Sequence, residues 1–247
     1  MWWVWSLRIG TRAGTSSFSG LAKTGDRWWD SGGQPPRMAP IQKKIRIRIT
    51  SKKFAEAARN LRVMSDYRKI FEAITSDPRY QRNLDWGEAR PGHPEGTVRA
   101  HIAELERNLE RLRPKLSETD FWRLKLLVHT HDAFKADAEP GVVIKAAKSH
   151  ASLARAFLAE FCDDPDLQAM VQYHDEPYAL WRQFEAKGRF NQDRFRALLT
   201  AITDWNLFLA FNIVDGCTEG KSREPLRWFF QQVTDRVQSK FTEADIL

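Results

Sequence analysis

Four of the six histidines lie on the apolar faces of four different predicted helices: His101, His131, His150 and His174. Each falls three or four residues from leucines, phenylalanines or a methionine of its own helix, so the four imidazoles should point into one core. A single buried histidine is usually a hydrogen-bonded core residue. Four that converge are hard to satisfy with backbone groups alone. A metal ion would bind all of them, because imidazole is the commonest metal ligand among side chains.

Carboxylates close to these histidines would complete a ligand set. Asp132 directly follows His131, so both side chains could reach an ion at the end of their helix. Asp204 lies within the apolar stretch 198–216, where a charge is costly unless it is paired or bound to metal. Asp215 falls on the same helical face as Asp204. We expect Asp204 to be the ligand, because predicted helix flanks it on both sides, although a cap or a salt bridge would also account for either aspartate.

Other polar residues near these positions have weaker assignments. Asp175 follows His174 and would either support an imidazole or cap a helix. His93 lies in a predicted loop near the mouth of the site. His129 lies on the opposite side of its helix from His131 and is interpreted as a surface or hydrogen-bonding residue. With Asp204 as ligand, the candidates for a substrate rim are Asp215, Thr218 and Lys221.

The elements that would position these residues are all helical. Apolar periodicity predicts two helices within 53–75, and further helices over 96–113, 117–132, 141–162, 164–175, 177–187, 191–215 and 223–240. Ser117 should cap the helix over 117–132, and Asp164 should cap a helix that begins with Pro165. Residues 77–96 are rich in turn formers and predict a loop. The aromatic residues of the C-terminal third, Trp181 among them, are interpreted as core. The fold class is therefore all-α.

The N-terminal part differs in composition from the rest. Residues 1–53 hold eleven Lys and Arg against two Asp, so the remainder, with 28 basic and 30 acidic residues, has a formal charge of −2. We interpret 1–52 as a disordered basic extension, with 43–50 as an arm or short strand and Met38 as an alternative start, and 53–247 as one helical domain. The charge of the domain gives no support to nucleic-acid binding. The lack of a long apolar run and of a signal peptide, with only two cysteines, predicts a cytoplasmic protein without a membrane span.

The ordered residues resemble the HD-domain superfamily of metal-dependent phosphohydrolases. The pattern is a histidine on one helix, a His-Asp doublet on a second and an aspartate on a late helix. The segment "HPEGTVRAHI" also resembles the one before the first metal histidine in the HD domain of bacterial CCA-adding enzymes, and "HDAFK" resembles the family's His-Asp-x-x-Lys. The resemblance implies an HD-like helical bundle that binds one or two divalent transition metal ions (Mn, Fe, Co, Ni or Zn). The implied ligands are His101, His131, Asp132, His150, His174 and Asp204.

The resemblance also implies a reaction. A divalent ion lowers the pKa of a bound water toward about 7, and two ions can clamp both oxygens of a displacement at phosphorus. Asp132 would bridge two ions and, like Asp204, would orient the attacking water. Lys135 would contact a phosphate of the substrate, helped by Lys221 or Arg223. We therefore expect a hydrolase of a nucleotide or other small phosphate ester. A mixed-valent di-iron oxygenase of the same superfamily and a non-catalytic binding module are the alternatives.

Overall fold

The computed structural model describes residues 66–247, and every regular element in that range is helical. The predicted extension 1–52, the arm 43–50 and the domain boundary at 52/53 lie outside the described residues. Residues 66–76 form the first helical segment. The elements that follow are α2 (Pro78–Asn83), α3 (Val98–Leu112), η1 (Arg113–Lys115), α4 (Glu118–Thr130), α5 (His150–Ala159), α6 (Pro165–Tyr173), α7 (Glu176–Lys187), α8 (Gln192–Ala201), α9 (Trp205–Gly216), α10 (Glu224–Val233) and η2 (Glu243–Asp245). The all-α fold class is confirmed.

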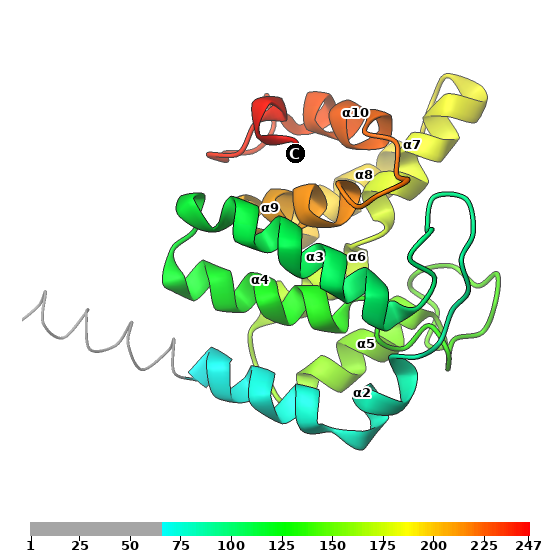
Figure 1. The fold of residues 1–247 in the computed structure, drawn as a ribbon. Coiled ribbons are helices and arrows are strands. Elements are labelled where there is room, and N and C mark those ends of the chain that lie inside the picture. The colour runs from blue at the N-terminus through cyan, green and yellow to red at the C-terminus, as the bar shows by residue number, and fades with distance from the viewer. Residues whose placement is uncertain (1–65) are drawn as a thin grey trace, which may run out of the picture. The chain divides into compact units, whose positions relative to one another are not determined.

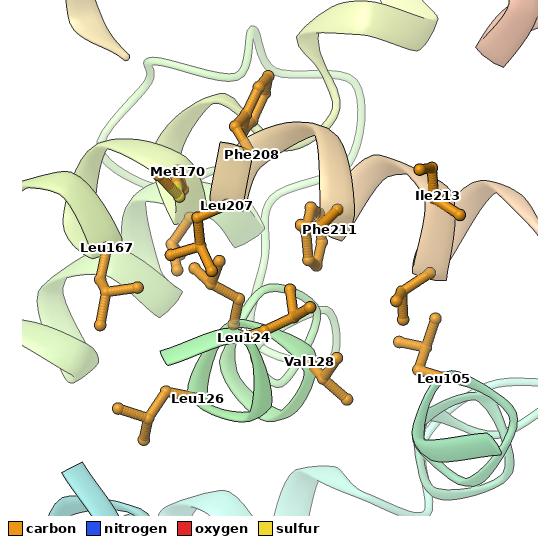
Figure 2. Close-up of a cluster of buried hydrophobic side chains, with 14 of the residues drawn as sticks. Leu105, Leu124, Leu126, Val128, Leu167, Met170, Leu207, Phe208, Phe211 and Ile213 are labelled. Carbon is orange, nitrogen blue, oxygen red and sulfur yellow. The ribbon is translucent and has the colours of Figure 1, made fainter. Parts of the chain in front are cut away.

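The helices α3, α4 and α9 pack against one another, and α6 closes the other side of α4. In Figure 1 these helices lie between the α7–α10 pair and α5. Helix α9 is apolar on every face and is buried continuously from Leu207 to Val214, as expected of a central helix. Figure 2 shows side chains of α4 pointing toward α3, α6 and α9. The labelled residues of this core are Leu105, Leu124, Leu126, Val128, Leu167, Met170, Leu207, Phe208, Phe211 and Ile213.

Side-chain caps start most of these helices where the sequence indicates. Ser117 accepts a hydrogen bond from Asp120 N at the start of α4, and Asp164 accepts from Asp166 N and Leu167 N at the start of α6. Both predicted caps are confirmed. The same Asp-Pro signal at Asp77 and Pro78 starts α2 inside the stretch that was predicted to be only a loop. A turn-rich composition therefore hid a short capped helix.

Three predicted helices differ from the observed ones. Residues 141–149 form turns, and α5 begins only at His150, because Ser149 caps it there by accepting from Ser152 N. The predicted helix 191–215 is two helices, α8 and α9, which meet at 116°. The break falls at residues 202–204, where Asp204 caps α9. The last predicted helix is shorter, since α10 ends at Val233.

No single helix in the described range is both long and apolar enough to cross a membrane; α8 and α9 reach the required length and composition only as a bent pair.

One guanidinium connects the starts of two helices to α4. Arg123 donates from Nε to Asp164 Oδ2 at 3.0 Å and from Nη1 to Asp204 Oδ2 at 2.6 Å. Tyr67 also donates to Asp164, at 2.7 Å. These bonds are largely shielded from water, which makes them stronger than surface ion pairs. They fix the first turns of α6 and α9 relative to α4.

We expect Arg123→Ala to lower the free energy of unfolding by about 2–3 kcal/mol, because two carboxylates lose charge-assisted hydrogen bonds. Urea unfolding followed by circular dichroism measures the change. Arg68→Ala is the control, since Arg68 pairs with Glu72 in the open, and its loss should cost about 0.5 kcal/mol or less. Equal losses in the two variants would contradict this role for Arg123.

Candidate metal centre

The four predicted histidines converge around the carboxylate of Asp132. His101 comes from α3, His131 follows the last residue of α4, His150 opens α5 and His174 follows the last residue of α6. Three of them are buried, and His150 is partly exposed. This convergence from four helices is the arrangement that the helical phase of the histidines predicts.

One half of the cluster combines two histidines and two aspartates. His101 Nε2 lies 3.1 Å from Asp215 Oδ1, and His131 Nε2 lies 3.4 Å from Asp132 Oδ2. The longer separations are 3.9 Å for His101 Nε2 to Asp132 Oδ2 and 4.0 Å for His131 Nε2 to Asp215 Oδ1. Two ligand atoms that bind the same ion at about 2.0–2.2 Å lie roughly 3–3.5 Å from each other. The four atoms are therefore close to the spacing that a shared ion requires.

The other half uses the second oxygen of Asp132. Asp132 Oδ1 lies 3.5 Å from His174 Nε2 and 3.8 Å from His150 Nε2, while the two Nε2 atoms are 3.2 Å apart. Asp175 Oδ2 completes this group at 3.1 Å from His150 Nε2 and 3.5 Å from His174 Nε2. Asp175 makes no side-chain cap on α7, so of its two predicted roles the one beside the imidazoles is correct. Asp132 thus presents one oxygen to each half.

Local backbone contacts orient two of the imidazoles. His131 and His174 occupy the C-cap positions of α4 and α6, where the carbonyls of the last turn have spare acceptor capacity; Leu127 O also accepts from His131 N. His131 Nδ1 lies 3.1 Å from the carbonyl oxygens of Leu127 and Val128, and His174 Nδ1 lies 2.8 Å from that of Val171. Once the imidazole is neutral, an Nδ1–H that donates to these carbonyls leaves Nε2 with its lone pair directed at Asp132. A His-Asp doublet at a helix end can therefore donate a hydrogen bond to carbonyls of the last turn and still direct its other polar atoms at the cluster.

Glu95 is a supporting residue that the sequence analysis missed. Its buried carboxylate Oε1 lies 2.9 Å from His101 Nδ1 and 3.0 Å from His93 Nδ1. The contact with His93 is a hydrogen bond, whereas the one with His101 has the distance but not the angle of a hydrogen bond. A carboxylate beside the remote nitrogen of a histidine favours one orientation of the ring. Glu95 lies in the loop before α3, where no periodicity marks it, and only its place between two histidines in "HPEGTVRAH" hinted at a role. His93 lines the opening above, as predicted.

Four buried side-chain atoms of the site have no hydrogen-bond partner among the described residues: Glu95 Oε2, His101 Nδ1, His131 Nε2 and Asp132 Oδ1. The last two lie at the centre of the cluster. Unpaired buried polar atoms are costly, and a cation at either half would satisfy these two. The groups His101–His131–Asp132 and Asp132–His150–His174 each bring three donor atoms within 4.8 Å of one another. The cluster could therefore hold a metal ion, and its donors fit the nitrogen and oxygen preferences of divalent transition metals.

Two lysines neutralise the carboxylates of the cluster. Lys135 Nζ contacts Asp132 Oδ2, and Lys221 Nζ lies 2.8 Å from Asp215 Oδ1. Burial alone would raise the pKa of Asp132, but Lys135 and His131 hold it well below its usual range. Lys221 and His101 do the same for the pKa of Asp215 against the effect of burial. Both carboxylates are thus ionised at neutral pH and available as ligands.

Asp204 is not part of the cluster, so the preference for it over Asp215 was wrong. Asp204 Oδ1 accepts from Leu207 N at 3.1 Å, and Oδ2 accepts from Arg123. The error follows from the predicted helix 191–215, whose break makes Asp204 a cap and leaves Asp215 near the end of α9. Asp215, which was expected at the substrate rim, therefore lies beside the candidate ligands, 3.1 Å from His101 Nε2. Of the other rim candidates, Lys221 lines the cleft, whereas Thr218 is buried and does not.

Arg223 is also placed differently from the expectation. Its guanidinium donates to the carbonyl oxygens of Gly216, Cys217, Thr218 and Lys221 at 2.8–3.0 Å. It therefore holds the turn after α9 and is not a cation of the cleft. His129, by contrast, matches its prediction, since it bonds to Tyr80 and Glu106 at 2.6 and 2.7 Å away from the cluster.

A cleft of about 520 Å³ opens above the cluster, a size that suits a small-molecule ligand. Its floor includes His131, Asp132, His174, Asp175 and Asp215. The cations in its lining are Arg90, Lys135, Arg182 and Lys221. The cluster is therefore accessible from one side, and that side is lined with positive charge.

No protein-family model, curated protein or solved structure matches this chain. What can be said of the site therefore comes from its own residues and geometry.

Asp215→Asn should remove bound metal, whereas Asp204→Asn should leave the metal content unchanged. Asp215 lies 3.1 Å from His101 Nε2, while both oxygens of Asp204 are engaged by Arg123 and Leu207 N. Elemental analysis of the purified variants after reconstitution with Mn, Co or Zn measures the difference. Loss of metal in Asp204→Asn with retention in Asp215→Asn would restore the original assignment.

Metal binding to the metal-free protein should release protons at pH 7. Burial opposes a charged His174, but Asp175 and Asp132 outweigh it and raise the pKa of this histidine to about 9. It must lose its proton before Nε2 can bind an ion, so affinity should rise as the pH increases toward 9. Burial lowers the pKa of His131, which therefore releases none. Calorimetry in buffers of different ionisation enthalpy counts the protons, and a buffer-independent heat would contradict the prediction.

Proposed function

We propose that this chain is a metal-dependent phosphohydrolase that acts on a nucleotide or other small phosphate ester. The observation that carries the proposal is the position of Asp132. Its Oδ2 faces His101 and His131, its Oδ1 faces His150 and His174, and His131, Asp132 and His174 line a cationic cleft. Such an arrangement suits two ions that act on one phosphate. The ordered set of histidines, with the doublet at a helix end and Asp215 as the last residue, supports the resemblance to HD-domain enzymes.

Divalent ions held by this cluster would supply an acidified water and would stabilise charge that develops on the phosphate. The role of the chain is to place the other groups. Asp132, kept ionised by Lys135, would accept a hydrogen bond from the attacking water and orient it. Lys135 and Lys221 line the cleft beside the two carboxylates and would donate to phosphate oxygens.

The rim of the cleft favours an anionic substrate. Arg90 and Arg182 line it, and neither makes an ion pair with any residue in 66–247. Uncommitted guanidiniums bind phosphate well, because their geometry allows paired hydrogen bonds. An uncharged substrate would leave these charges without a partner. A purely structural metal site tends to be coordinatively closed, whereas this one opens to a cleft, which speaks against the non-catalytic module.

We expect the protein, reconstituted with Mn, Co, Ni, Fe or Zn, to release inorganic phosphate from a panel of nucleotides and sugar phosphates. The double variant His131→Ala, Asp132→Ala should lose both metal and activity. The control is His129→Ala, which removes a histidine from the same helix that bonds to Tyr80 and Glu106 instead of facing the cluster. It should retain the metal and the activity.

Other outcomes would overturn the proposal. Two equivalents of iron with substrate-dependent oxygen uptake and no phosphate release would favour the oxygenase. A wild-type protein that binds no metal after reconstitution would leave a helical binding module.

A further inference from the structure

Two aromatic side chains of α7 stack together in the wall of the cleft. The rings of Tyr178 and Trp181 are 5.6 Å apart between centroids, with 29° between their planes. Both residues line the same cleft as Asp132 and Asp175. Trp181 also packs against the core, so it supports the tyrosine from behind instead of being core alone, as the sequence suggested.

Tyr178 is unusually exposed for a large side chain with an apolar ring. Within 66–247, the large hydrophobic side chains that remain exposed are Trp86, Val143, Tyr178 and Phe184. Of these, Tyr178 alone lines the cleft above the cluster, and it is 51% exposed. Exposed apolar surface inside a cleft is typical of a ligand contact.

The position of the pair along α7 relates it to the metal cluster. Asp175, which belongs to the cluster, immediately precedes α7, and Tyr178 and Trp181 follow it by three and six residues. With a rise of about 1.5 Å per residue, they lie about 4.5 and 9 Å further along the helix. Residues three apart share a helical face, which is why all three line one wall. If a ligand places its phosphate at the cluster, a group separated from that phosphate by about one sugar ring would therefore reach Tyr178 and Trp181.

Charge at this end of the cleft fits the same ligand. Arg182 follows Trp181 directly and lines the cleft without an ion pair to any described residue. A guanidinium can stack on a planar ring or bind a further phosphate, and it needs no proton exchange to do either. Stacking and positive charge together are how proteins hold nucleotides without reading a particular base.

We propose that Tyr178, backed by Trp181, is a specificity-determining residue that seats a planar aromatic ring of the substrate. The ring would be a nucleobase or an aryl group joined to the phosphate that the cluster receives. This inference rests on the proposed function for the phosphate end of the ligand. Tyr178 would favour phosphates that carry an aromatic ring over plain sugar phosphates. The metal cluster itself does not discriminate between these two classes.

Calorimetry on the metal-loaded protein tests the inference with paired ligands, the non-hydrolysable phosphonate analogues of AMP and of ribose 5-phosphate. The wild type should bind the AMP analogue about 10-fold more tightly or better, as expected for one base on an aromatic platform. Tyr178→Ala should bind the two equally, and Tyr178→Phe should keep the preference. The adenine H2 and H8 proton resonances should move upfield on binding to the wild type but not to Tyr178→Ala. A phenyl phosphonate then distinguishes an aryl group from a nucleobase.

Phe184→Ala is the matched control. Phe184 lies on the same helix, is 39% exposed and stacks on Trp228 at 5.4 Å and 28°, but it does not line the cleft. Its loss should leave the preference intact. Equal binding of both analogues by the wild type would overturn the inference, even if the protein hydrolyses phosphate esters. A preference that depends on Tyr178, without hydrolysis of any ester, would overturn the phosphohydrolase and leave the aromatic seat.

Discussion

The buried carboxylate of Asp132 is the charge on which the arrangement of this protein depends. It lies almost wholly inside the protein, and an isolated charge there would be strongly destabilising. Lys135 on its own segment and His174, whose pKa is raised to about 9, compensate this charge, and imidazoles from α3, α4 and α5 surround it. Helices α3, α4, α5 and α6 must therefore keep their ends in register, and the apolar core around α4 and α9 holds them there. Removing any one partner would leave a buried charge less compensated, which usually costs more than the lost contact itself.

The sequence was sufficient for the all-α class and for the convergence of the histidines, because both follow from one periodicity. A histidine in phase with leucines must point where the leucines point, whatever the loops do. Asp204 and Asp215 show the limit of this reasoning. They share a face only if 191–215 is one straight helix, and a break at 202–204 without glycine or proline is not visible in the pattern. The angle of 116° between α8 and α9 moves Asp204 to Arg123 and leaves Asp215 with His101.

Residues outside regular helices were harder to predict, for a physical reason. Glu95 reaches His101 from a loop whose path depends on close backbone contacts. A Cβ on Gly87 would lie 2.5 Å from the carbonyl oxygen of Gly96, so these turns admit no side chain there. The helical position of Tyr178 can be predicted from the sequence. Its exposure in a cleft cannot, because it depends on where α10 and the turn after α9 end. Arg223 holds that turn, because its guanidinium donates hydrogen bonds to backbone carbonyl oxygens. Such contacts between distant segments leave no local signal.

The two halves of the cluster are built alike but differ in access. In each, a histidine at the C-cap of a helix donates Nδ1–H to the carbonyls of its own last turn, and the aspartate after it turns toward the same centre. Asp132 is buried, whereas the side chain of Asp175 is 47% exposed and its partner His150 is also partly open. Both halves reach the cleft, since His131, Asp132 and Asp215 line it together with His174 and Asp175, but Asp175 is the more exposed of the flanking aspartates. Asp132, with one oxygen in each half, is the side chain that joins them.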